Sequence, residues 1–212
     1  PPQVIACLQR EMGLTPQMTV ADVGAGTGLL TALLLANGNT VYAVEPNAGM
    51  RQAAEAALGG HANFHSIDGR SDATTLPAAS VDLVTAAQAF HWFEPVATRA
   101  EFRRILRAPH WVALIWNERR QRTPFMQAYE RLLAGYGTDY RQVDHRYAAD
   151  FPALERFFAP SPFRQFTFSN EQVLDLDGMV GRLASTSYMP APGTEGYAVL
   201  LAQAQALFEQ YA

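Results

Sequence analysis

Hydrophobic residues in the first two thirds of the chain follow two different spacings. Short apolar runs rich in β-branched and aromatic residues predict buried strands, at residues 19–23, 40–44, 63–67, 81–86 and 111–116. Apolar residues at three- and four-residue spacing predict helices, at residues 29–36, 50–58, 95–106 and 125–133. Repeated strand–helix units of this kind predict an α/β fold with a Rossmann-like, doubly wound, mostly parallel sheet and helices on both faces.

The pattern changes at about Gln121, where helical and loop segments rich in aromatic residues begin. One strand-like stretch interrupts them at residues 163–168. We interpret this final third as a helical cap over the carboxyl edge of the sheet. Because no repeat or low-complexity linker separates the two parts, we expect one domain over residues 1–212, with a core at 1–120 and a cap and substrate-side region at 121–212.

Composition narrows the possible functions. Of the 212 residues, 49% are hydrophobic and 17% are charged, which fits a globular domain with one core. No apolar run approaches the roughly 20 residues of a membrane span, and the first ten residues lack a signal-peptide pattern, so we expect a cytoplasmic protein without a membrane partner. The net charge of -4 offers no basic surface to nucleic acid and favours a small-molecule acceptor.

The content of cysteine, lysine and histidine removes further classes of protein. Cys7 is the only cysteine, which excludes an internal disulfide and a cysteine-rich zinc site. All 16 basic residues are arginine, so no lysine can form a Schiff base or serve a phosphate-binding loop. His61 and His65 lie in a predicted turn and strand rather than on one helix face, and we therefore expect no metal site.

A glycine-rich turn joins the first predicted strand to the first predicted helix through Gly24, Gly26 and Gly28. Glycines allow a tight turn and a close approach of the backbone to a ligand, and amides at a helix start favour an anionic group. A dinucleotide fingerprint would place a third glycine at Leu29, so a Rossmann-type oxidoreductase is the weaker alternative. Glu45 follows the second strand, where it is either a ribose-binding carboxylate or a solvated turn residue.

The segments DVGAGTG, VEPNAGM and VDLVTAAQAFHWF, in this order, closely resemble class I methyltransferases that use S-adenosylmethionine (SAM). More narrowly, they are similar to the branch related to ubiquinone-biosynthesis and trans-aconitate methyltransferases. The resemblance covers residues 2–120 well and the remainder loosely. It implies an enzyme that moves the methyl group of SAM to a small acceptor, in which a carboxylate would fit the trans-aconitate relation. A SAM-binding module without catalysis is the alternative.

The same resemblance assigns residues to each part of SAM. The methionine end of SAM is assigned to Asp22, Gly24, Ala25, Gly26 and Gly28. The ribose is assigned to Glu45, and the adenine to Pro46, Asn47 and Met50. Many relatives place an acid after the third strand, on the adenine amino group. Arg70 stands at that position here, so we expect the adjacent Ser71 and Asp72 to make the adenine contact.

The fourth predicted strand delivers AQAFHWF to the carboxyl edge of the sheet, where ligands bind in open α/β folds. Methyl transfer is an in-line displacement that gains most from alignment and desolvation. We expect Gln88 to place SAM through its amide and His91 to orient or deprotonate the acceptor. A packed imidazole is the alternative for His91. Trp92 is a candidate acceptor contact, with simple packing as the alternative for it and for Phe93.

Candidate acceptor contacts also lie beyond the fifth strand. Arg119 and Arg120 follow it closely, and the planar fork of an arginine suits a carboxylate, although most exposed arginines are only solvated. Tyr188 lies in the segment STSYMP and could reach the acceptor. The same segment is also explained as a helix end stopped by Pro190.

The resemblance carries a last expectation about the two ends. Relatives usually have a helical segment ahead of Pro2 and a strand hairpin after the helix that here ends at Tyr211. We therefore expect at most six parallel-type strands, an unpaired sheet edge beside residues 163–168, and a SAM cleft more exposed than that of a complete relative.

Overall fold

The structure of the chain is a computed structural model that describes residues 3–117, 120, 122–137, 151–184, 189–190 and 193–211. These residues fall into two compact units. The first comprises Pro1–Trp116 and Asp150–Phe168, and the second comprises Asn117–Ala149 and Ser169–Ala212. Each unit is described by itself below.

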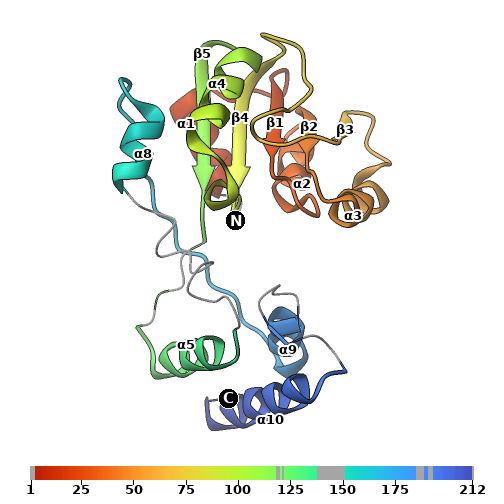
Figure 1. Cartoon of the computed structure of the whole chain (residues 1–212), viewed down its shortest axis with the longest axis vertical. Helices are drawn as coiled ribbons and strands as arrows, with labels where there is room; N and C mark the ends of the chain where they lie inside the picture. The colour runs from red at the N-terminus through yellow and green to blue at the C-terminus, as the bar shows by residue number, and fades with distance from the viewer. Residues whose placement is uncertain are drawn as a thin grey trace. The chain divides into compact units, whose positions relative to one another are not determined.

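The first unit is built on a sheet of five parallel strands in the order β3-β2-β1-β4-β5 (Figure 1). The strands are β1 (Thr19–Val23), β2 (Thr40–Val44), β3 (Phe64–Ile67), β4 (Val81–Ala87) and β5 (Leu106–Ile115). The chain proceeds outward from β1 to β3 and then returns to the other side of β1. The strand order therefore reverses between β1 and β4, which is where open α/β sheets bind ligands.

Helices cover both faces of this sheet. On one face lie α1 (Gln3–Met12), α2 (Leu29–Ala36) and α3 (Ala48–Leu58), and on the other lie α4 (Pro95–Ile105) and α8 (Phe151–Phe158). Alternate residues of β1 show the division, because Val20 packs with Leu34 of α2 whereas Ala21 packs with Phe102 of α4. These contacts confirm the predicted α/β fold.

The fifth strand differs most from the expected pattern. The structure extends it back to Leu106, directly after α4, whereas the sequence predicted a start at residue 111. Regular pairing with β4 begins at Trp111, after a shift in register and a residue with positive φ, His110. The alternation of apolar residues is lost across this irregular part, so the pattern alone could not reveal the strand there.

The strand expected at residues 163–168 is not formed, which corrects the prediction. This stretch instead attaches to α1 through side chains. Arg164 pairs with Glu11 at 2.7 Å, and the ring of Phe166 lies under the guanidinium groups of Arg10 and Arg164. Its alternating aromatic and polar residues are thus used for cation–π and ionic contacts rather than for strand pairing. Across the described residues, β5 has β4 as its only strand neighbour.

The second unit is helical. It contains α5 (Pro124–Tyr136), α9 (Leu176–Ala184) and α10 (Glu195–Tyr211), which share an apolar core that includes Leu133, Met179 and Leu200. Its place over the sheet remains a prediction. In the part of the chain that the structure describes, no helix is both long enough and apolar enough to cross a membrane.

Candidate functional site

The glycine turn between β1 and α2 is fixed by its neighbours through close contacts. The amides of Gly24 and Ala25 both donate to the carbonyl of Val44, at the end of β2, over 2.8 and 3.2 Å. A Cβ added to Gly24 would lie 2.4 Å from the Cβ of Ala89, and one added to Gly28 would lie 2.6 Å from Leu58. Both glycines also have positive φ, so the turn requires glycine for space as well as for conformation.

Gly26 differs from Gly24 and Gly28 because it faces open space. Its φ is 58°, but a Cβ placed on it would meet no atom within 4 Å. Its amide donates to Oε2 of Glu45 over 3.0 Å. The backbone therefore leaves open space next to a carboxylate and ahead of the start of α2, where a helix favours an anionic group. This open space is where the sequence predicts the methionine end of SAM.

Glu45 is buried at the end of β2, and two backbone amides orient its carboxylate. Besides Gly26, the amide of Asn47 donates to its Oε1 over 2.9 Å. An ionised carboxylate has about four acceptor positions, so about two remain for other donors. A pair of ribose hydroxyls suits this arrangement. Pro46, Asn47 and Met50, the expected adenine contacts, lie exposed at the start of α3 beside it.

Arg51, which the sequence analysis did not identify, holds the turn around Glu45. Its Nη1 donates to the carbonyls of Glu45 and Pro46 over 2.9 and 2.8 Å, and its Nη2 pairs with Asp68 at 2.9 Å. A cation near a helix start is unfavourable unless it has such partners. The position of Arg51 in the first turns of α3 was therefore a signal that could have been used.

Asp22 is the other acid of the motif, and the structure places it inside the core. It is 1% exposed, with Oδ2 accepting from the Thr31 hydroxyl at 2.7 Å and Oδ1 from the Thr85 hydroxyl at 3.0 Å. Burial raises the pKa of Asp22 to about 6, against the opposing effect of the two hydroxyls. These contacts tie β1 to α2 and β4. A direct contact of Asp22 with SAM stays a prediction.

The expected adenine residues after β3 have different surroundings. The guanidinium of Arg70 binds both carboxylate oxygens of Asp72, which lowers the pKa of Asp72. Ser71 is buried, and its Oγ accepts from the Thr98 hydroxyl over 2.9 Å. Asp72 is therefore already engaged by its own loop. Of the two candidates, Ser71 is the one whose hydroxyl hydrogen is still available to donate.

The segment after β4 brings the expected acceptor residues to the same edge of the sheet. Gln88 has positive φ, and its backbone N–H donates to the carbonyl of Ile115 over 2.9 Å. A single turn of 3-10 helix, η1 (Phe90–Trp92), follows and carries His91, whose ring lies 4.9 Å from that of Trp92. Trp92 is 69% exposed, so it is not a packing residue, which argues for a surface role.

Phe93 behaves differently from Trp92. Its ring meets those of Phe90 and Phe102 edge to face, in the core beneath α4. It also lies 3.5 Å from the position of a Cβ on Gly24. Together with the contact between Gly24 and Ala89, this brings the segment after β4 against the glycine turn. The expected cofactor and acceptor residues of the first unit therefore share one edge of the sheet.

The other acceptor candidates are not among the described residues of the first unit. Arg120 is exposed and belongs to the second unit, whereas Arg119 and Tyr188 lie outside the described residues. Their roles stay predictions. His65 stacks on Tyr42 at 4.9 Å. Throughout the described ranges, no group of three or more His, Cys, Asp or Glu residues is arranged to hold a metal ion.

Comparison with known proteins identifies the family. The methyltransferase domain family matches residues 21–113, which include the glycine turn, Glu45 and the segment after β4. An uncharacterised methyltransferase of Geobacillus thermodenitrificans is 30% identical over 148 residues, which are 68% of this chain and 68% of that protein. The chain belongs to the methyltransferase family. Methyltransferases of this family take the methyl group from SAM, so the expected family and cofactor are confirmed and the oxidoreductase alternative is wrong.

Other similar methyltransferases differ in how much of their length is shared. One from Mycobacterium tuberculosis, also uncharacterised, is 31% identical over 174 residues, but the chain spans only 64% of its length. Among solved structures, a candidate type II methyltransferase from Anaeromyxobacter dehalogenans has a TM-score of 0.67 and 24% identity, covering 98% of this chain and 88% of that one. A candidate methyltransferase from an antibiotic biosynthesis pathway of Anabaena variabilis has a TM-score of 0.56 and 25% identity, covering 73% and 60%.

Proposed function

We propose that this methyltransferase domain binds SAM at the glycine turn and catalyses methyl transfer to a small-molecule acceptor that carries a carboxylate. The observation that carries the proposal is the open space at Gly26, whose amide donates to the oriented carboxylate of Glu45. The residues present fit SAM. Amides at the start of α2 suit its carboxylate, and Glu45 suits its ribose hydroxyls.

The remaining parts of the site follow from position and chemistry. When bound, SAM supplies a methyl group activated by a positively charged sulfur. The acceptor atom forms a bond to the methyl carbon as the carbon–sulfur bond breaks, which leaves neutral S-adenosylhomocysteine (SAH). His91 takes the proton of the acceptor, Gln88 orients the cofactor, and Trp92 forms an aromatic wall that suits a cation.

The acceptor class rests on charge and composition. A chain with a net charge of -4 does not attract polyanions, which favours a small molecule. Arg119 and Arg120 provide guanidinium groups for a carboxylate, and Tyr188 provides a hydroxyl. Small acids retained on an anion exchanger, incubated with labelled SAM, should therefore yield a labelled product. In Arg119→Ala or Arg120→Ala the KM for that acid should rise, whereas Arg131→Ala in α5 should not change it. If neither variant affects the KM, the carboxylate is excluded.

Calorimetric titration with SAM tests the cofactor site. Gly26→Val should abolish binding, because its side chain would occupy the open space beside Glu45 that SAM needs. Gly13 is a matched control, since it also has positive φ and nothing within 4 Å of an added Cβ. Gly13→Val should bind SAM like the wild type. If either variant unfolds, the same pair with alanine keeps the comparison. Failure of the wild type to bind SAM, or equal binding by Gly26→Val, would overturn the proposed site.

Turnover tests the role of His91. His91→Gln and His91→Phe should lower the rate of SAH formation by about a hundredfold if the imidazole accepts the proton. SAM affinity should change little, because His91 lies on the acceptor side. An unchanged rate with a lower melting temperature would show that the ring only packs. SAM binding by the wild type without transfer to any acceptor would identify a binding module instead.

A further inference from the structure

A polar stripe on α4 faces the loop between β3 and β4. Thr98, Glu101 and Arg104 follow one another at three-residue spacing, which places them along one side of the helix. The loop comprises residues 68–80 and contains no helix or strand. Each of the three side chains binds a different point of it. The loop is therefore held by a helix that comes later in the chain.

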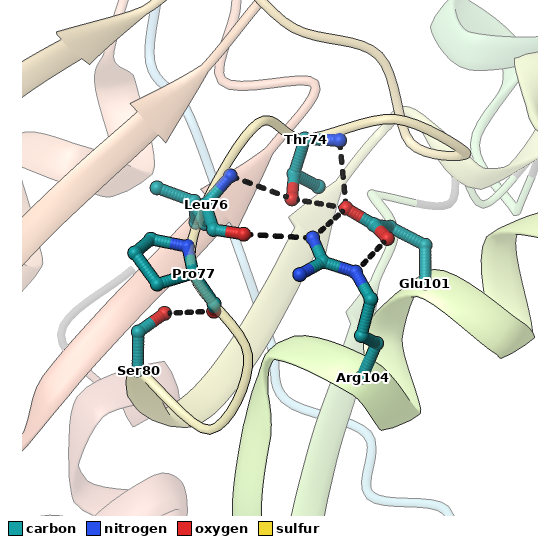
Figure 2. A network of polar contacts seen from close by, with 6 residues as sticks. All are labelled: Thr74, Leu76, Pro77, Ser80, Glu101 and Arg104. Atoms are coloured by element: carbon teal, nitrogen blue, oxygen red, sulfur yellow. Dashed lines mark hydrogen bonds and ion pairs between the residues drawn. The ribbon is translucent and has the colours of Figure 1, made fainter.

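The contacts of Glu101 and Arg104 are shown in Figure 2. Oε1 of Glu101 accepts from the amide of Thr74 over 2.9 Å and from its hydroxyl. Arg104 donates from Nε and Nη2 to the two oxygens of Glu101, both at 2.7 Å, and from Nη2 to the carbonyl of Leu76, also at 2.7 Å. Thr98 completes the stripe by donating to Ser71. We refer to these contacts as the α4 ladder.

Glu101 is charged in this arrangement although it is buried. Hydrogen bonds from Arg104 are the main reason that its pKa falls to about 2, and Thr74 adds to the effect, while burial opposes it. A partly buried ion pair such as this adds little net stability, but it fixes geometry because each partner accepts only a few positions. The α4 ladder thus selects one conformation of the loop.

The loop packs against the end of β2, at the residue before Glu45. A Cβ on Gly69 would lie 2.9 Å from the carbonyl oxygen of Thr74 and 3.0 Å from Val44 Cγ1. Val44 immediately precedes Glu45, and Thr74 is the residue that Glu101 holds. A shift of Thr74 would therefore move the turn that carries Ser71.

We propose that Glu101 is a positioning residue for base recognition, which holds the loop so that Ser71 reads the adenine of the cofactor. The Ser71 hydroxyl accepts from Thr98 and donates its own hydrogen to a ring nitrogen of the base. In this chain the Ser71 hydroxyl would thus make the adenine contact that an acid makes in many relatives. The proposal rests on the proposed SAM site, and it adds selectivity for the adenine base, which SAM binding alone does not require.

Two ligands separate base recognition from general stability. We would measure the dissociation constants of SAH and of its inosine counterpart, in which an oxygen replaces the 6-amino group and changes the adjacent ring nitrogen from acceptor to donor. Wild type should prefer SAH by about tenfold, the effect of one hydrogen bond. A loss of folded protein multiplies both constants equally, so the ratio is insensitive to it.

Glu101→Gln should reduce the preference to nearly one. Thr98→Val should do the same, although it leaves the contact between Glu101 and Thr74 intact. Arg107→Gln is the control, because it breaks an ion pair with Asp82 at the amino ends of β4 and β5, and it should keep the wild-type ratio. Absence of SAH binding by the wild type would overturn the proposed site itself. SAH binding with no base preference in the wild type, or an unchanged ratio in both variants, would overturn the positioning role alone.

Discussion

The end of β1 and the α4 ladder each bury a carboxylate, and the net pKa shifts of the two groups have opposite signs although burial raises both pKa values. Asp22 has two hydroxyl partners, and burial raises its pKa to about 6. Glu101 has a guanidinium, an amide and a hydroxyl, and its pKa falls to about 2. Hydroxyl and amide donors do not offset the loss of water around the charge of Asp22, whereas the guanidinium of Arg104 does so for Glu101. Burial by itself therefore does not decide the direction in which the pKa of an acid is shifted.

The contrast suggests different reasons for keeping each acid. A charge at Asp22 is unfavourable for the fold at neutral pH, so its value would lie with a cationic ligand such as SAM. The charge at Glu101 is favourable in the folded state, so its value lies in holding the loop. Two predictions test this difference, and two more concern the cofactor site; the four follow in order of decreasing effect.

The largest effect is expected for Asp22→Asn. Because the folded pKa of about 6 lies above the reference value of 3.8, the folded protein binds the extra proton between these values, and stability falls as the pH rises through this range. With each pKa unit worth about 1.4 kcal/mol, the charge at pH 7 costs about 3 kcal/mol. Urea unfolding should show that the stability of Asp22→Asn relative to the wild type is higher at pH 7 than at pH 3.5 by about this amount.

The same variant should bind SAM less tightly than the wild type, which would separate ligand binding from stability. Asp177→Asn, an exposed acid in α9, is a suitable control and should change stability by less than about 0.5 kcal/mol. A stability difference between Asp22→Asn and the wild type that does not vary with pH would contradict the assigned pKa of Asp22.

Glu101→Gln should have the opposite sign. Its folded pKa of about 2 lies below the reference value of 4.5, so its contribution is complete above pH 4.5 and is lost as the pH falls toward 2. Arg104 is 43% exposed, and water therefore weakens the pair. We expect a loss of about 1–3 kcal/mol in the free energy of unfolding at pH 7. A variant as stable as the wild type at pH 7 would show that the ion pair is not needed by the fold.

Glu45→Ala should affect the ligand rather than the fold. It leaves ribose hydroxyls without their acceptor, and SAM affinity should fall by about 1–3 kcal/mol. Calorimetry measures this loss. Glu55→Ala, an exposed acid on α3, is the control and should leave affinity unchanged. Equal affinity of Glu45→Ala and the wild type would remove Glu45 from the cofactor site.

The smallest effect is expected for Arg51→Ala, which acts through Glu45. Loss of its bonds to the carbonyls of Glu45 and Pro46 should weaken SAM by about 1 kcal/mol. The double variant with Glu45→Ala should be no weaker than Glu45→Ala alone, because a positioning residue has nothing left to position. Additive losses would instead indicate that Arg51 acts independently of Glu45.

Much of this molecule follows from local sequence. The strands β1 and β2 match the prediction to the residue, because short runs rich in apolar and β-branched residues end before a glycine or an acid. The glycine turn was equally evident, since backbone with positive φ favours glycine at Gly24, Gly26 and Gly28. These features depend on neighbours along the chain, so a pattern was enough to predict them, together with the family.

Other features depend on residues that are distant in sequence. Thr98 and Ser71 are 27 residues apart, and nothing local to either indicates a partner. Trp92 and Phe93 are adjacent aromatic residues, and nothing local indicates that Trp92 is exposed whereas Phe93 packs against the core. Residues 163–168 have a strand-like pattern, yet their side chains bind α1 instead. Local sequence determined the fold class, the family and the glycine turn, because backbone conformation and apolar spacing are local properties. Only the tertiary structure decided which side chains hold the loops, because that choice depends on which helix packs beside them.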